Sequence, residues 1–287
     1  MRIVSLVPNG TEILFALGAG EWVVGVSHEC DYPREARQRR QLTGSALPPG
    51  LATAAIDAAV SAQLASGESL YTLEEAAIAE LAPDLIVTQN LCPVCAVSTA
   101  QVEGAVAPLA RCPEVLALDP KTLEEVFASI VQTGDAIGKG GTARGLVAVL
   151  KGRLARLASA GKKLSPKPRV AALEWLDPPF AAGHWVPEMI TAAGGVDLFA
   201  TPGAPSRRLT FEDVAAADPD VIVVMPCGFD EDGAAAQMAL LREHPVWNTL
   251  RAVEEGRAVP VDANGLFSRP GPRLVDGVER LVGIFSV

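Results

Sequence analysis

Aromatic residues are scarce in this chain and make up only 5% of its 287 residues. No apolar run approaches the ~20 residues that a membrane-spanning helix needs. The start of the sequence also lacks the basic region, apolar stretch and small-residue cleavage site of a secretory signal. We therefore expect a cytoplasmic protein if Met1 is the native start. The net charge of −10 argues against a surface for nucleic acid or anionic membrane, because both favour clustered Lys and Arg.

Several motifs of catalysis and disulfide scaffolds are also missing. The five cysteines are an odd number, so they cannot form a fully paired framework. The glycine-rich segments do not have the order of a phosphate-binding P-loop, and there is no Gly-x-Ser-x-Gly elbow. Because no convincing set of catalytic residues is present, we expect a protein that is not an enzyme and has no catalytic cofactor.

Cys92 and Cys95 form the sharpest local motif, a C-x-x-C pair. Three readings stay open: a redox pair, half of a zinc site, or a loop that lines a ligand cleft, with or without a disulfide. A four-ligand zinc site would need two more ligands, and the chain has no second C-x-x-C and no H-x-x-x-H. We favour the cleft-lining loop.

Short apolar runs of strand length alternate with helical segments along the whole chain. Residues 142–160 read as one uninterrupted helix, which at 1.5 Å per residue is roughly 28 Å long. The strand–helix–strand pattern on both sides of it predicts an α/β fold: two lobes with mostly parallel sheets, joined by one long helix, with a ligand cleft between them. We divide the chain into an N-terminal lobe at 1–119, a helical connection at 120–167 and a C-terminal lobe at 168–287.

The two lobes share a short internal pattern. Residues 75–84 read EAAIAELAPD before LIVT, and residues 212–220 read EDVAAADPD before VIVV. Each predicts a helix with an acidic start and a Pro-Asp stop, followed by a buried strand. Near the N-terminus, Asn9 and Glu12 have the spacing of a capping box, which predicts that Asn9 caps the first helix.

The few rings of the chain gather in residues 173–195, LEWLDPPFAAGHWVPEMITAAGG. We interpret this stretch as a stiff, proline-set loop at the end of a strand, where open α/β sheets bind ligands. Trp175, Phe180 and Trp185 would then grip something flat and large; ordinary core packing is the alternative. His184 on the same loop could coordinate a metal such as cobalt, or be a hydrogen-bonded loop histidine.

A second candidate segment lies near the C-terminus. Phe267 is expected in a turn beside Arg269 and offers another ring. Arg269 and Arg273 carry planar donors that suit ligand amides or phosphate, although solvated surface charge is the alternative for each.

Several segments resemble one known family over nearly the full chain and in the right order: the substrate-binding proteins of ABC importers for cobalamin, siderophores and haem, with two lobes bridged by a long helix. The cobalamin-binding members are most similar. They share the S-x-x-P-x-x-T-E opening from Ser5, the D-Y-P at 31–33 and the PPF-x-x-G loop at 178–183. The matching segments are VSLVPNGTEILFALGAGEWVVGVSHECDYP, LAPDLIVT, LEWLDPPFAAGHWVPEMITAAGG, LTFEDVAAADPDVIVV and VDANGLFSRPGPRL.

The resemblance implies a protein that binds cobalamin or a related corrinoid in the cleft and delivers it to the permease of an ABC importer. It also implies a periplasmic or cell-surface location and docking through one acidic residue on each lobe, Glu212 and, beside the equivalent position, Glu75. We expect a monomer. The candidate ligand contacts are Tyr32, Cys92, Trp175, Phe180, His184 (toward cobalt), Trp185, Phe267 and Arg269.

Two alternatives remain at this point. A haem- or ferric-siderophore-binding protein would have the same fold with another ligand. An intracellular enzyme or metal-handling protein would instead use His28, Cys30, Cys92 and Cys95 as metal ligands.

Overall fold

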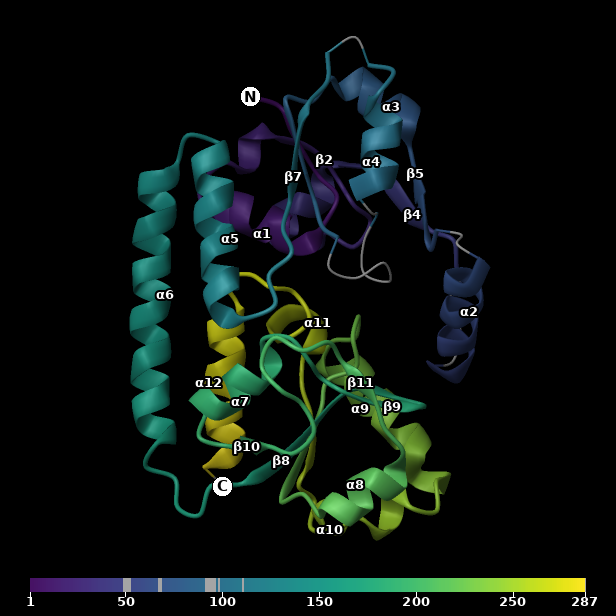
Figure 1. Ribbon diagram of the computed structural model, residues 1–287, viewed down its shortest axis with the longest axis vertical. Helices are drawn as coiled ribbons and strands as arrows, with labels where there is room; N and C mark the ends of the chain where they lie inside the picture. The colour runs from purple at the N-terminus through teal and green to yellow at the C-terminus, as the bar shows by residue number, and fades with distance from the viewer. Residues whose placement is uncertain (49–52, 67–68, 91–96, 98, 110, 287) are drawn as a thin grey trace. The chain divides into compact units, whose positions relative to one another are not determined.

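The structure, a computed structural model, describes residues 1–48, 53–66, 69–90, 97, 99–109 and 111–286 (Figure 1). The chain divides into two compact units. Unit 1 comprises Met1–Pro120 and Glu125–Val147, and unit 2 comprises Lys121–Glu124 and Ala148–Val287.

Unit 1 is built on a parallel sheet with the strand order β3-β2-β1-β6-β7. The buried side chains of β1 and β6, among them Val4 and Ile86, form its core together with residues of α3 and α4. A separate antiparallel pair is formed by β4 and β5. The strands are β1 (Ile3–Ser5), β2 (Val23–Val26), β3 (Arg40–Gln41), β4 (Thr43–Ser45), β5 (Tyr71–Leu73), β6 (Leu85–Thr88) and β7 (Glu114–Ala117).

The helices around this sheet lie between its strands in sequence, as expected for parallel pairing. Short 3₁₀ helices cover Gly20–Trp22 and Arg34–Gln38. The α-helices of this part of the chain are α1 (Pro8–Ala16), α2 (Thr53–Ser66), α3 (Glu75–Leu81), α4 (Thr99–Val106) and α5 (Leu123–Ala136).

The start of α1 corrects one prediction. Asn9 does not cap this helix: the N-cap is Val7, without a side-chain hydrogen bond, and Pro8 occupies the first turn. Proline is well suited to that position, because its fixed φ matches the helix and its missing N–H would have no helical partner there. Asn9 and Glu12 are instead buried inside the helix.

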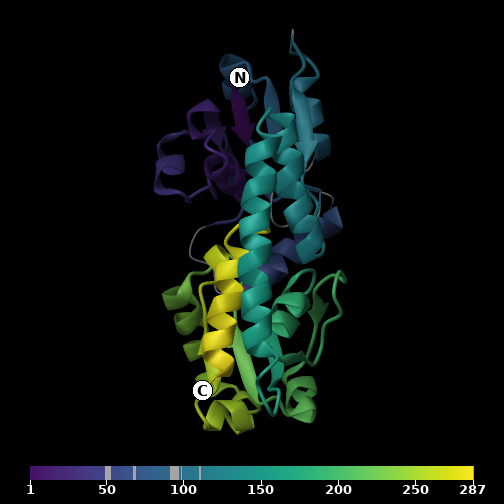
Figure 2. The same ribbon diagram turned by 90° about the vertical axis from the view of Figure 1, so that its left-hand side faces the viewer.

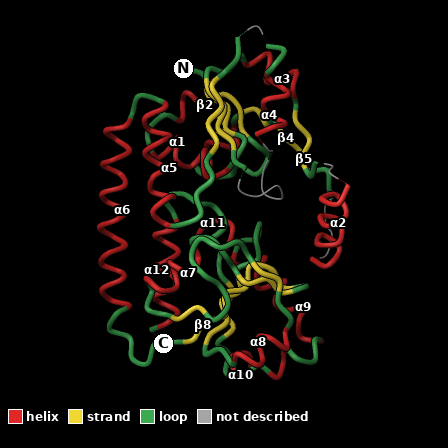
Figure 3. The backbone as a smooth tube through the Cα atoms, in the orientation of Figure 1, coloured by secondary structure: helices red, strands yellow, loops and turns green. Residues whose placement is uncertain are grey.

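Unit 2 has a second sheet with the order β11-β9-β8-β12-β13, and β10 pairs with β8 as well. The pairs among β8, β10, β12 and β13 are parallel, whereas β9 is antiparallel to both β8 and β11. Figure 3 shows the sheets in yellow with helices in red around them. The strands are β8 (Arg169–Leu176), β9 (Pro179–Ala181), β10 (Val196–Asp197), β11 (Arg207–Arg208), β12 (Val221–Val224) and β13 (Ala258–Pro260).

The mixed α/β fold with mostly parallel sheets is therefore confirmed, and so is the long helix, which extends over Gly140–Gly161 as α6. The chain passes from unit 1 to unit 2 inside this helix. The helices of unit 2 that follow are α7 (Val186–Ala192), α8 (Phe211–Ala217), α9 (Glu231–Leu240), α10 (Arg251–Glu254), α11 (Ala263–Leu266) and α12 (Leu274–Phe285), with 3₁₀ turns at Leu241–Glu243 and Trp247–Thr249.

Within unit 2, α12 lies along the second half of α6 (Figure 2). Arg153 on α6 forms ion pairs of 2.8 Å with Asp276 and 2.9 Å with Glu279 on α12. These side chains are partly exposed, so each pair contributes only about 0–1 kcal/mol. Among the described residues, no helix has the length and apolar character required to cross a membrane.

The sequence pattern shared by the two units corresponds to a shared local structure. α3 and α8 both end in a left-handed residue, Ala82 and Asp218, which precedes a Pro-Asp pair. The following aspartates, Asp84 and Asp220, each accept a 2.8 Å hydrogen bond from the backbone N–H of the residue that leads into the neighbouring parallel strand. We call these two arrangements the Asp clamps.

The donor residue of each Asp clamp makes a further matching contact. In unit 1, Arg2 donates its backbone N–H to Asp84 and its guanidinium to the carbonyl of Leu81, 2.6 Å away. In unit 2, Arg169 does the same with Asp220 and with the carbonyl of Ala217, at 2.7 Å. Each clamp therefore joins the end of a helix, α3 or α8, to the start of a neighbouring parallel strand, β1 or β8.

Candidate functional site

The stretch over 173–195 is not the loop that the sequence predicts. β8 continues through Trp175 to Leu176, and after a cis Asp177–Pro178 bond the chain returns as β9. The register pairs Trp175 with Phe180, so both rings project from the same face of a hairpin. Asp177 and Pro178 form the turn, and Pro179 is already the first residue of β9, so the prolines do not end the sheet as a proline-set loop would.

A third ring joins this hairpin from the next strand of the sheet. Phe229 follows the carboxyl end of β12, and its ring centroid lies 6.2 Å from that of Trp175. Trp175, Phe180 and Phe229 are all half-buried, so each leaves part of its ring accessible. Sequence reasoning did not select Phe229, although its place after the apolar run VIVV follows the rule for ligand sites in open sheets. We call these three rings the aromatic row.

The segment after β9 is fixed by the backbone around Gly183. A Cβ at this position would lie 2.5 Å from the nitrogen of Ser206 and 2.6 Å from the carbonyl oxygen of Ala204, so only glycine fits. The next residue, His184, has a φ of +54° and donates its N–H to the Ala204 carbonyl at 2.7 Å. The final glycine of the PPF-x-x-G motif thus lets two loops pass at backbone distance and sets the position of His184.

The imidazole of His184 is half-buried and has its centroid 5.6 Å from the ring of Trp185. Burial lowers the pKa of His184 below its ordinary value, and the positive charge of Lys121 lowers it further. A neutral imidazole is the form that can bind a metal ion.

The other predicted contacts of unit 2 are buried. Trp185 is 6% exposed, Phe267 1% and Arg269 6%. The indole N–H of Trp185 donates to the carbonyl of Phe267 at 2.7 Å, which ties the loop after β9 to the loop after α11. Direct contact of these three side chains with a ligand stays a prediction; their observed role is to pack beneath the loops.

In unit 1, the segment after β2 contains the candidate ligand contact Tyr32 and the candidate metal ligands His28 and Cys30. Tyr32 is 47% exposed and precedes a cis bond to Pro33. Cys30 is buried and accepts a hydrogen bond from the Thr11 hydroxyl, with 3.1 Å between oxygen and sulfur. His28 has its Nδ1 2.7 Å from the hydroxyl of Thr43, and its ring lies near that of Tyr71.

Cys92 and Cys95 lie outside the described residues, so the readings of their motif stay predictions. Within the part of the chain that is described, no group of three or more His, Cys, Asp or Glu side chains could hold a metal ion.

The two candidate docking residues have similar positions in their units. Glu75 begins α3 and Glu212 lies in the first turn of α8, and both are exposed. Thr210 and Asp213 form a capping box at the start of α8, which fixes the turn that presents Glu212.

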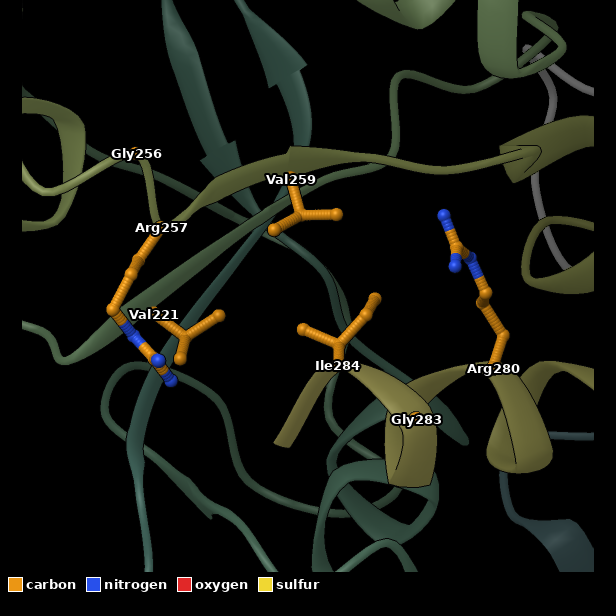
Figure 4. A pocket seen from close by; sticks show the side chains of 7 residues that line it. All are labelled: Val221, Gly256, Arg257, Val259, Arg280, Gly283 and Ile284. Carbon is orange, nitrogen blue, oxygen red and sulfur yellow. The ribbon is translucent and has the colours of Figure 1, made fainter. Parts of the chain in front are cut away.

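Unit 2 also has a hollow of about 250 Å³ away from the aromatic row (Figure 4). Val221, Val259 and Ile284 line it between the side chains of Arg257 and Arg280. It lies beside the amino end of β12, opposite to the end that Phe229 follows. Its volume is below the ~300–1,000 Å³ of typical small-molecule sites, so the aromatic row is the better candidate.

Two α/β units connected through a long helix, with accessible rings at the carboxyl ends of the strands, define the class of protein: one that binds a small molecule on preformed surfaces. The family described as "Periplasmic binding protein" matches residues 3–264. The chain belongs to this family. Its members are non-catalytic transport components that bind small-molecule ligands and work with ABC importer permeases.

The individual relatives differ in the ligand that they bind. The chain is 26% identical to the "Uncharacterized ABC transporter substrate-binding lipoprotein YvrC" of Bacillus subtilis, over 98% of this chain and 78% of that protein. It is also 26% identical to the "Vitamin B12-binding protein" of Vibrio cholerae, over 98% and 87%. The structure is similar to the "Periplasmic heme-binding protein RhuT" of Roseiflexus sp. RS-1, with a TM-score of 0.73 at 24% identity over 99% and 97% of the two chains.

The family match shows a substrate-binding protein, and the relatives named above include one that binds vitamin B12 and one that binds haem. Relatives that bind different metal macrocycles are similarly distant from this chain. The choice among such ligands therefore depends on the residues of the site.

Proposed function

We propose that this protein binds cobalamin or a related corrinoid and delivers it to an ABC-type importer. The observation that carries the proposal is the aromatic row, whose three rings stand half-exposed at the carboxyl ends of β8 and β12. The similarity to a vitamin B12-binding protein along 98% of the chain supports it. Binding in a cleft between the two lobes stays a prediction.

The aromatic row suits a corrin ring because its three half-buried rings offer apolar surface to the mainly apolar faces of the macrocycle. A pair of stacked or tilted rings contributes about 0.5–1.5 kcal/mol beyond the area that it buries. Trp175 is held by its indole N–H, which donates to the carbonyl of Asp177 at 3.2 Å, so little rotamer freedom would be lost on binding. Tyr32 of unit 1 is a further proposed contact, and so is Cys92.

Titration of the purified protein with cyanocobalamin tests this proposal. Saturable calorimetric heats at micromolar or tighter affinity, together with a change in the visible spectrum, are expected. Trp175→Ala should weaken binding by about 10- to 100-fold, because it removes roughly 1.5–3 kcal/mol of ring burial. Trp22→Ala is the matched control, since it removes the same side chain from the 3₁₀ turn before β2.

Haem and a ferric siderophore, titrated in the same way, decide the ligand. Tight binding of either one without binding of cyanocobalamin would contradict the corrinoid proposal. Zinc or iron in stoichiometric amounts in the purified protein, again without corrinoid binding, would favour the metal-handling alternative.

A further inference from the structure

A charged side chain extends the aromatic row on the next strand of unit 2. β11 pairs with β9 in a register that places Arg208 opposite Phe180. On the other side of β9, Trp175 of β8 is opposite the same Phe180. Residues that face each other across antiparallel strands project from the same face. Trp175, Phe180 and Arg208 therefore stand in one line across β8, β9 and β11.

Arg208 lies on the ring beside it. Its guanidinium carbon is 5.1 Å from the centroid of Phe180, within the ~6 Å over which a cation is attracted to a ring face. Arg208 is exposed and Phe180 half-buried. A guanidinium held against a ring loses little freedom when it binds, and its planar donors match the two oxygens of a carboxylate or phosphate.

Charges of both signs lie at the row, since Asp177 and Asp230 are close in sequence to Trp175 and Phe229. The protein has a net charge of −10, yet Arg208 stands at one end of the row. The positive charge of Lys121 also reaches the neighbouring loop, where it contributes to the lowered pKa of His184. At the β11 end of the row, the guanidinium of Arg208 beside Phe180 suits an ionised carboxylate or phosphate on a ligand that covers the rings.

We propose that Arg208, stacked on Phe180, binds an ionised carboxylate or phosphodiester carried by the macrocyclic ligand and makes the site favour ligands with such a group over those that lack it. This inference rests on the proposed function and deepens it. The acidic group has two possible sources: the phosphodiester of cobalamin or the propionates of haem.

The test measures dissociation constants of the full chain for two ligand pairs. Cyanocobalamin is compared with dicyanocobinamide, which lacks the nucleotide loop that contains the phosphodiester, and haem with its dimethyl ester, whose carboxylates are blocked. In each pair, the acidic member carries the ionised phosphodiester or carboxylate and the uncharged member lacks that group. Arg208→Gln should raise the dissociation constant for the acidic member of the pair that binds by about tenfold or more, as expected for the loss of a charged hydrogen bond. The uncharged member should change by less than about twofold.

Arg207→Gln is the matched control. This substitution removes the same charge from the same strand. Arg207 is paired with the buried Ala181, so its side chain projects from the face opposite to that of Arg208. It should leave both members of each pair within about twofold of the wild type. Arg208→Lys, which keeps the charge without the planar guanidinium, should fall between wild type and Arg208→Gln.

The outcomes separate the two proposals. If the wild type binds a macrocycle but Arg208→Gln weakens the acidic and uncharged members equally, or no more than Arg207→Gln does, the Arg208 inference is wrong and the binding function stands. If the wild type binds neither pair, both proposals fail. Effects confined to cyanocobalamin identify the phosphodiester as the group bound, and effects confined to haem identify the propionates.

Discussion

At the scale of single residues, His184 is the side chain that we expect to coordinate a metal ion of the ligand. Its imidazole is kept neutral to lower pH by burial and by Lys121, so it could serve as an axial ligand to cobalt at neutral pH. If it does, cyanocobalamin or aquocobalamin bound to the protein should show replacement of an axial ligand in the visible spectrum, and His184→Ala should abolish that change.

The pH dependence of this spectral change gives a second measurement. An ordinary histidine has a pKa of about 6.5, and protonation blocks coordination. Because the folded value is lower, coordination should persist below that pH and be lost only on further acidification. Lys121→Gln should move the loss to higher pH, whereas Lys121→Arg, which keeps the charge, should not. Identical spectra with and without His184 would contradict cobalt coordination.

Gly183 is the residue on which the geometry of the loop depends. Its Cα–H faces the backbone of 204–206, so Gly183→Ala must push two loops apart. Overpacking of this kind costs about 1–3 kcal/mol, and the displaced His184 loop should also bind ligand more weakly. Thermal unfolding and calorimetric titration measure the two effects.

Gly152 on α6 is the control for Gly183. A Cβ there would approach only the flexible end of Arg156, at 3.9 Å. Gly152→Ala should therefore raise stability by about 1 kcal/mol through helix propensity, without changing ligand affinity. If both variants behaved alike, the close approach at Gly183 would not matter for the site.

At the scale of elements, the Asp clamps explain why the same sequence pattern occurs in both units. The hydrogen bond from the Arg2 backbone lowers the pKa of Asp84 most strongly, and that from Arg169 does so for Asp220. The folded chain therefore binds these protons less readily than the unfolded chain, whose Asp pKa is about 3.9. The stabilisation is complete above that pH and is lost as pH falls through the lower folded values.

Replacement of the clamp carboxylates should reduce this acid sensitivity. Asp84→Asn and Asp220→Asn should each lower the urea midpoint at pH 7, and each should show a smaller further loss between pH 5 and pH 2 than the wild type. Glu103→Gln, at an exposed position on α4, is the control. An unchanged pH dependence in both Asp variants would show that the clamps do not contribute to acid unfolding.

The elements also show which parts of the fold a sequence can predict. The long helix, predicted over 142–160, extends over Gly140–Gly161, because its uninterrupted helical composition agrees with the final structure. The β8–β9–β11 ladder was not predicted. The pairing of β11 with β9 joins residues far apart in the sequence, such as Arg208 and Phe180, and a two-residue strand such as β11 has no periodic signal of its own.

The residues of the site also differ in whether the sequence alone could indicate them. Trp175 and Phe180 could be selected because rings are scarce and gather with prolines. Arg208 could not, since its relevance comes from the register of β11. The place of Phe229 after the strand VIVV was a usable signal, but its approach to Trp175 follows only from the path of the loop after β12. The burial of Trp185 and Phe267 is likewise a property of tertiary packing that their residue types do not reveal.

At the scale of the whole molecule, the remaining question is how the protein meets its importer. Glu75 and Glu212 are exposed in the first turns of α3 and α8, two helices that end in the same Asp clamp. The repeated local structure places acidic residues at the start of a helix in each unit. We expect these carboxylates to pair with basic residues of the permease, because complementary charges guide and orient such encounters.

Charge reversal tests this expectation without disturbing the ligand site. Glu212→Arg and Glu75→Arg should each reduce stimulation of the importer's ATPase by at least about tenfold at low salt, since an attractive contact becomes repulsive. The cost to each helix from its dipole is only about 0.3–1 kcal/mol, so folding should survive. Ligand affinity, measured by titration, should stay unchanged.

Glu243→Arg is the control: it reverses another exposed charge of unit 2 and should change neither stimulation nor ligand affinity. Reduced ligand affinity with intact stimulation would instead assign these glutamates to binding rather than docking.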